Sequence, residues 1–178
     1  MPGVTRANAV WPVFHTDGVR HRDHWRVRGG EGIAMKQAQV TVRKIDALVA
    51  FLPAFEAPGR EFIQKWVTPG GDESVPVMPY PEYDEDVKRF FELASQEIWL
   101  DHDYDPETAG RMLTDPVTIA AADLPEVKTM LTHCVQGERF CNGHWSGVLK
   151  DGSVVSLLKR LRELREQMQT QAPQPCAS

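Results

Sequence analysis

The sequence contains little cysteine and no long apolar run. Three of its 178 residues are cysteine, an odd number that argues against a disulfide framework and favours a reducing, cytoplasmic location. No stretch of about 18 apolar residues occurs, so we expect no membrane-spanning helix. The sequence does not begin with a basic segment followed by an apolar stretch and a small-residue cleavage site, so we do not expect export by a signal peptide. These absences favour a small cytoplasmic protein that is long enough to bury a core.

The common signatures of catalysis and nucleotide binding are also missing. The chain has no GxxxxGK[ST] loop, no GxSxG elbow, no HExxH pair and no GxGxxG turn after an expected strand. We therefore favour a non-enzymatic binding or regulatory module that needs no cofactor. Its expected ligand is an unidentified protein partner rather than nucleic acid, and the sequence does not predict an oligomeric state.

The first 34 residues differ from the rest of the chain. They show neither helical nor strand periodicity, and a Gly-Glu-Gly string precedes Met35. Purine-rich codons for that string would resemble a ribosome-binding site, so we expect residues 1–34 to be a spurious or disordered extension. An arginine-rich targeting peptide is the alternative. We expect a helical domain over residues 35–169 and a disordered tail over 170–178.

From residue 43 onward, apolar residues recur with the period of a helix. One stripe covers residues 45–55 and should break near Pro53, and others cover 83–100, 138–149 and 153–168. The sequence predicts a mainly α fold, a compact single-domain bundle of six or seven helices, with room for a short strand or hairpin near residues 62–78. The segment VPVMPYPEY is too rich in proline for a central strand, so we expect an extended loop with Tyr80 and Tyr83 packing inward.

Several helix starts have capping residues. Asp105 and Asp115 each precede a proline, which is the usual order of N-cap and first helical residue. Asp123 and Glu126 have the spacing of a capping box. Among the large apolar residues, we expect Trp99 and Phe140 to be buried.

Acidic residues are concentrated in one segment. Residues 82–107 contain ten acidic and two basic residues, in a chain of net charge −5. Such a segment disfavours binding to phosphate backbones. It predicts either a solvated helix surface or an acidic surface for a basic partner or a cation.

The segment IWLDHDYDPETAG resembles a calcium loop at first, because Asp101, Asp103 and Asp105 alternate. An EF-hand loop needs glycine at its sixth position and glutamate at its twelfth, where this chain has Pro106 and Met112. The EF-hand interpretation therefore fails.

A looser metal site remains as an alternative. Asp101, His102 and Asp103 offer oxygen and nitrogen donors, and with His144 they could bind one divalent metal ion in a metal-dependent hydrolase. Independently of a metal, loops carry function more often than helix interiors do. We therefore predict a binding site in which Asp101, His102 and Tyr104 lie near His144.

Cysteine and histidine cluster in THCVQGERFCNGHW. Four side chains there could complete a zinc site: His133, Cys134, Cys141 and His144. We expect Cys141 and His144 on one helix face, where they could also form a nucleophile pair. The simpler interpretation places Cys134 in the core.

A second alternative function, nucleic-acid binding, depends on the mildly basic C-terminal helix through Lys159, Arg160, Arg162 and Arg165.

Three blocks of the chain carry a family resemblance. They are LVAFLPAFE, MPYPEYDEDVKRFFELA and DLPEVKTMLTHCVQGERFCNGHWSGVLKDGSVVSLLKRLREL, of which ERFCNGHW…DG…LLKRL is the most distinctive. Over about residues 44–166 the chain resembles an uncharacterised bacterial domain of unknown function. The resemblance implies a small prokaryotic or phage-associated cytoplasmic protein, and it carries no activity or catalytic residue.

Overall fold

The computed structural model describes residues 40–68 and 78–170. The chain divides into two units, Met1–Met35 and Lys36–Ser178, and every described residue belongs to the second. The predicted extension over residues 1–34 lies outside the described residues, as does the tail from residue 171 onward.

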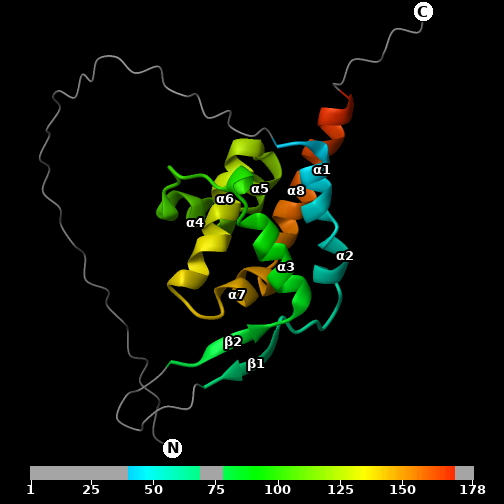
Figure 1. The fold of residues 1–178 in the computed structure, drawn as a ribbon. Coiled ribbons are helices and arrows are strands. Elements are labelled where there is room, and N and C mark those ends of the chain that lie inside the picture. Colours follow the sequence, from blue (N-terminus) through cyan, green and yellow to red (C-terminus); the bar gives the residue numbers. More distant parts are fainter. Residues whose placement is uncertain (1–39, 69–77, 171–178) are drawn as a thin grey trace, which may run out of the picture. The chain divides into compact units, whose positions relative to one another are not determined.

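The described residues form eight α-helices, two 3-10 helices and one two-stranded sheet (Figure 1). The α-helices are α1 Val42–Val49, α2 Leu52–Phe55, α3 Glu85–Ala94, α4 Pro106–Thr114, α5 Pro116–Ala121, α6 Leu124–Gln136, α7 His144–Lys150 and α8 Ser153–Thr170. The 3-10 helices are η1 Glu97–Trp99 and η2 Gly137–Arg139, and the strands are β1 Ile63–Val67 and β2 Tyr80–Tyr83. The prediction of a mainly α domain with a short hairpin is confirmed.

Local capping explains where several helices begin. The Asp105 carboxylate accepts the Thr108 N–H at the start of α4, and the Asp115 carboxylate accepts the Val117 N–H at the start of α5. Asp123 and Glu126 exchange two hydrogen bonds at the start of α6, which is the predicted capping box. The predicted break near Pro53 separates α1 from α2.

The core lies around α8, which packs against α1, α5, α6 and α7. The largest fully buried side chains are Trp99, Phe90, Phe91, Ile45, Leu48, Met130, Leu131, Leu157, Leu158 and Leu161. Trp99 is 1% exposed, which confirms its predicted burial.

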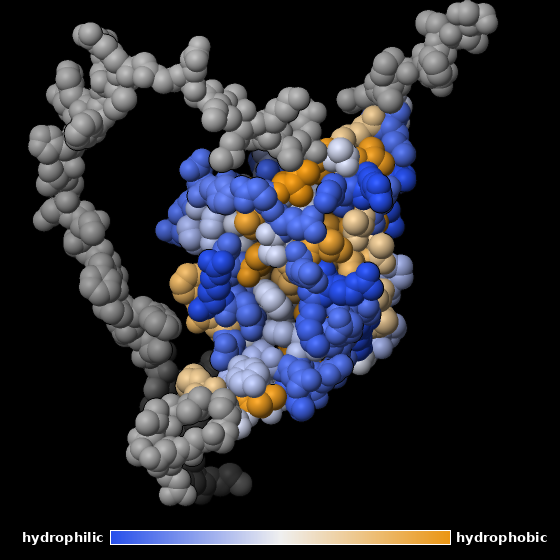
Figure 2. Space-filling view, in the orientation of Figure 1, coloured by the Kyte–Doolittle hydropathy of each residue, from blue (hydrophilic) through white to orange (hydrophobic). Residues whose placement is uncertain are grey.

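No helix among the described residues is long and apolar enough to cross a membrane. Hydrophilic residues cover most of the face in Figure 2, and hydrophobic residues show in separate patches.

Two helix predictions are wrong in their extent. The helix expected over residues 83–100 ends at Ala94, and Gln96 is extended before η1 begins. The helix expected over 138–149 begins only at His144, because Gly143 has a φ of 93°, which interrupts the helix.

The burial predicted for two aromatic residues is also wrong. Phe140 is 87% exposed, because it lies in the loop before α7 rather than on a helical stripe. Tyr80 is exposed as well, whereas Tyr83 is buried as expected.

The hairpin lies at one end of the domain (Figure 1). Its strands are antiparallel, with Trp66 opposite Pro81 and Val67 opposite Tyr80. At its base, the Arg60 guanidinium binds the carboxylates of Asp84 and Asp86 and the carbonyl of Ala54. These bonds join the chain entering β1 to the start of α3, so the hairpin has a fixed base.

Candidate functional site

The aspartate-rich segment between η1 and α4 forms hydrogen bonds with other parts of the domain. Asp101 accepts a hydrogen bond from the Thr129 hydroxyl at 2.5 Å, and its backbone N–H donates to the Thr132 hydroxyl at 2.9 Å. His102 binds the Glu97 carboxylate at 2.7 Å on the surface. Asp105 caps α4. Asp103 has no side-chain partner among the described residues.

Most other acidic side chains of residues 82–107 also bind residues of the domain. Of the ten acidic side chains in residues 82–107, only Glu92 and Asp103 lack a side-chain hydrogen bond or ion pair with a described residue. Three of the four basic residues of α8 are similarly paired: Lys159 with Glu56, Arg160 with Glu163 and Arg165 with Asp46. Much of this charge is therefore balanced within the domain.

The predicted neighbours of His144 are only partly brought together. The Tyr104 ring lies 6.4 Å from the His133 ring, and the His133 ring lies 6.0 Å from the His144 ring. Tyr104 and His144 thus flank the same histidine. Asp101 and His102 have the other partners just described.

The described residues contain no group of three or more His, Cys, Asp or Glu side chains that could hold a metal ion. The ligand set of Asp101, His102, Asp103 and His144 therefore finds no support in the geometry. For the zinc alternative, Cys134 is fully buried, and this burial raises the pKa of its thiol to about 12. Cys141 is exposed in the loop before α7, so the expectation that it shares a helix face with His144 is wrong.

The loop between α6 and α7 is held by one carboxylate. Glu138 accepts the Tyr83 hydroxyl at 2.7 Å and the backbone N–H groups of Gly143 and Trp145 at 2.9 and 3.0 Å. Burial, together with the bond to Glu138, raises the pKa of Tyr83. Tyr83 therefore remains a neutral donor, and Glu138 joins β2, the loop and the start of α7.

Further contacts fix the same loop from both sides. The Trp145 ring stacks on Phe91, with centroids 4.4 Å apart and planes 5° from parallel. The Asn142 amide donates to the Pro79 carbonyl at 2.9 Å. The Trp66 ring lies so close to Gly143 that a Cβ there would meet it at 3.1 Å. The loop is therefore rigidly placed beside the hairpin.

Large side chains are exposed where this loop lies beside the hairpin. Trp66 is 53% exposed, Met78 is 78% exposed and Phe140 is 87% exposed, and Arg139 lies beside them. We call these four residues the aromatic surface. They line a cavity of about 690 Å³ whose other walls are Thr68, Pro79, Cys141 and Asn142. Three of the five exposed large hydrophobic residues in the described chain belong to it.

Sequence patterns did not reveal the aromatic surface. Phe140 fits a helical stripe, and a tryptophan such as Trp66 is more often buried than exposed. The available signal was Gly143, because Gly143 and Gly147 both weaken the interpretation of residues 138–149 as a helix. A left-handed glycine there separates Phe140 from the apolar face of α7.

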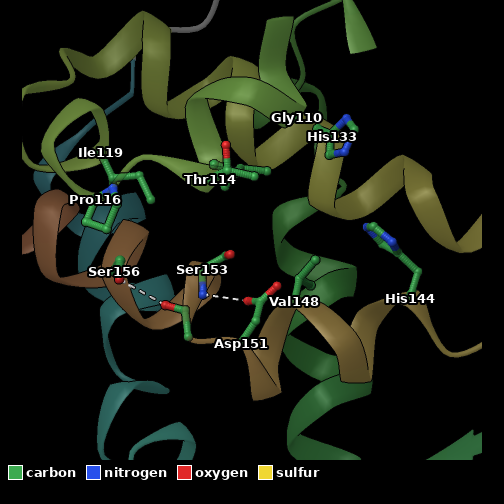
Figure 3. Close-up of a pocket in the computed structure, with 12 residues that line it drawn as sticks. Gly110, Thr114, Pro116, Ile119, His133, His144, Val148, Asp151, Ser153 and Ser156 are labelled. Atoms are coloured by element: carbon green, nitrogen blue, oxygen red, sulfur yellow. Dashed lines mark hydrogen bonds between the residues drawn. The ribbon is translucent and has the colours of Figure 1, made fainter. Parts of the chain in front are cut away.

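A second cavity, of about 490 Å³, lies between α4, α5, α6 and the turn from α7 to α8. Figure 3 shows its polar side chains, which include His133, His144, Asp151 and Ser153. Burial lowers the pKa of His133 and that of His144, and the proximity of His144 lowers the pKa of His133 further. Both imidazoles are therefore neutral at pH 7. Sequence analysis considered His133 only as a zinc ligand and placed His144 in the predicted site near Asp101, and it missed Asp151 and Ser153.

Comparison with known proteins gives one match. No curated protein and no solved structure matches the chain. A family model described as a family of unknown function, DUF6508, matches residues 40–167. This range contains the hairpin, both cavities and the helices except for the last three residues of α8, and it covers more than half of the chain, so the protein belongs to the DUF6508 family.

Proposed function

We propose that this domain is a non-enzymatic docking module that binds a partner protein through the aromatic surface. The observation that carries the proposal is Phe140, a large apolar side chain that is 87% exposed on a loop held rigidly by Glu138 and Asn142. Loop tips usually carry small or polar residues. A fixed and exposed phenylalanine has little value for the fold but can supply an anchor for binding.

The composition of the aromatic surface supports a protein ligand. Trp, Phe, Met and Arg are the residue types enriched in protein interfaces, and an aromatic ring can bury about 150–250 Å². The cavity between Trp66 and Phe140 suits apolar side chains of a partner segment. Among the described residues that line it, Arg139 is the only charged one, so the partner segment should also carry a carboxylate.

A distinct partner fits better than a second copy of the chain. The protein has a net charge of −5, so two copies repel each other at low salt. The proposal includes a cytoplasmic location, which is supported by the free thiols of Cys134 and Cys141.

Site-specific photo-crosslinking can test the proposal. A photoreactive phenylalanine analogue replaces Phe140 in the full chain, expressed in its own host cells. The control places the analogue at Val117, which is 75% exposed and lies outside the aromatic surface. We expect one heterologous protein to be crosslinked from position 140 and not from position 117.

Binding of that protein is then measured with purified components. Phe140→Ala and Trp66→Ala should each weaken binding at least tenfold, about 1.4 kcal/mol, while Val117→Ala leaves it unchanged. Because Phe140 is exposed, Phe140→Ala should change the free energy of unfolding by less than about 0.5 kcal/mol. Crosslinks to a second copy, crosslinks within the chain, or equal binding by all three variants would refute the proposal.

A further inference from the structure

The second cavity is lined by both apolar and polar side chains. Leu113, Ile119 and Val148 contribute apolar surface. The polar lining comes from His133 of α6, His144 of α7, and Asp151 and Ser153 of the turn into α8, with Val148 between Asp151 and His144 (Figure 3). A cavity of about 490 Å³ has the size of a small-molecule site, and this pattern of a few convergent polar groups on an apolar wall is typical of one.

Only one of the two carboxylate oxygens of Asp151 accepts a hydrogen bond from a described residue. Its Oδ1 accepts the Ser153 N–H at 2.8 Å at the start of α8. Figure 3 shows the second oxygen turned into the hollow, on the same side as the Ser153 hydroxyl. No described residue donates a hydrogen bond to that second oxygen. It is therefore available to a ligand that carries a hydrogen-bond donor.

The two imidazoles are also without protein partners. Neither His133 nor His144 makes a side-chain hydrogen bond with a described residue, and the Nε2 atom of His144 is buried and unpaired. Figure 3 shows the His144 ring directed from α7 toward His133. A neutral imidazole has one nitrogen that accepts a hydrogen bond, so the half-buried His133 can add an acceptor to the cavity, whereas the buried Nε2 of His144 lies against Gly137.

The charge around the cavity favours a positive ligand. No lysine or arginine lines it, whereas Asp151 is a wall residue and Glu138 is near enough to act on His144. The positive end of α8 would attract an anion, but Asp151 already occupies the first N–H of that helix. A metal ion is a poorer fit, because no three ligating side chains are grouped among the described residues.

We infer that this cavity binds a small organic cation, with an ammonium or amidinium group against Asp151 and an apolar body against Leu113, Ile119 and Val148. The protonated nitrogen donates to the free oxygen of Asp151. This site is independent of the aromatic surface, since the two cavities share no lining residue.

Three probes with the same ring and different head groups can test the inference: benzylamine, benzyl alcohol and benzoate. Each is titrated at pH 7.5 into the 15N-labelled full chain while amide chemical shifts are followed. Benzylamine should bind with a Kd of about 1 mM, at least tenfold tighter than benzyl alcohol, and benzoate should not bind. The amides of Gly152 and Ser153 should shift most.

Variants identify the carboxylate that is responsible. Asp151→Asn keeps an oxygen for the Ser153 N–H but removes the charge, so benzylamine should bind at least tenfold more weakly. Asp103→Asn, at an exposed carboxylate outside the cavity, is the matched control and should bind as the natural protein does. If Asp151→Asn does not fold, the ratio of benzylamine to benzyl alcohol affinity in the natural protein decides the question. A ratio near one, tighter binding of benzoate, or no saturation by about 50 mM benzylamine would overturn the inference.

Discussion

Residues 101–105 and residues 138–143 are both short polar loops that enter a helix, yet they use their side chains in opposite ways. In the first, Asp101 is bonded to the threonines of α6 and Asp105 caps α4. In the second, Glu138 and Asn142 also serve the fold, but Phe140 between them is left in solvent. Polar residues that suggest a catalytic or metal site can instead form the hydrogen bonds that stabilise the fold. An apolar residue that suggests a core position can instead be exposed and free for binding.

The largest difference between the two regions should appear in their tryptophans. Trp99, at the base of the aspartate loop, is 1% exposed, and Trp66, in the aromatic surface, is 53% exposed. Trp99→Ala should lower the free energy of unfolding by about 3–5 kcal/mol, because it removes a core aromatic. Trp66→Ala should lower it by less than about 1 kcal/mol. Urea denaturation measures both, and equal losses would contradict the contrast.

Removing the charge of Glu138 should have an intermediate effect. Glu138→Gln loses an acceptor and the charge at a half-buried group that receives three hydrogen bonds, so we expect a loss of about 1–3 kcal/mol of unfolding free energy. The control is Glu97→Gln, which affects only the exposed pair with His102 and should cost less than about 0.5 kcal/mol. If the two variants lose the same stability, Glu138 does not hold the loop.

The smallest expected effect concerns acid. Hydrogen bonds from Thr108 lower the pKa of the Asp105 carboxyl below its usual value of 3.8. The folded state therefore binds fewer protons there than the unfolded state. The resulting stabilisation is present above about pH 4 and is lost as the pH falls through the lowered pKa.

Asp105→Asn tests this linkage, because asparagine also caps helices but does not titrate. Its unfolding temperature should fall less than that of the natural protein between about pH 5 and pH 2.5, by about 1–2 °C. Scanning calorimetry at both pH values measures the difference. Parallel pH profiles would mean that Asp105 contributes nothing to acid sensitivity.

Sequence analysis succeeded where structure depends on near neighbours. The caps at Asp105 and Asp115 and the capping box of Asp123 need only residues within one helical turn. Trp99 was correctly predicted to be buried, although its helix is a 3-10 turn. These signals are local, so they survive errors in the overall arrangement.

The predictions that failed depend on contacts between distant segments. Phe140 has the spacing of a helical stripe, and its exposure follows from the left-handed Gly143 and from the hairpin that lies against it. Asp151, His133 and His144 line one cavity although the three positions share no sequence motif. Periodicity carries no information on either arrangement.

The bond between Tyr83 and Glu138 joins residues 55 positions apart and has a consequence for how the protein opens. The hairpin is a small two-stranded sheet at the end of the domain, the kind of element that detaches in partial opening events long before the helices separate. Detachment would break the Tyr83–Glu138 bond and part Trp66 from Phe140 while the helices stayed folded. The aromatic surface should therefore be lost on warming before the helical signal falls, and hydrogen exchange should be faster in the hairpin than in α8.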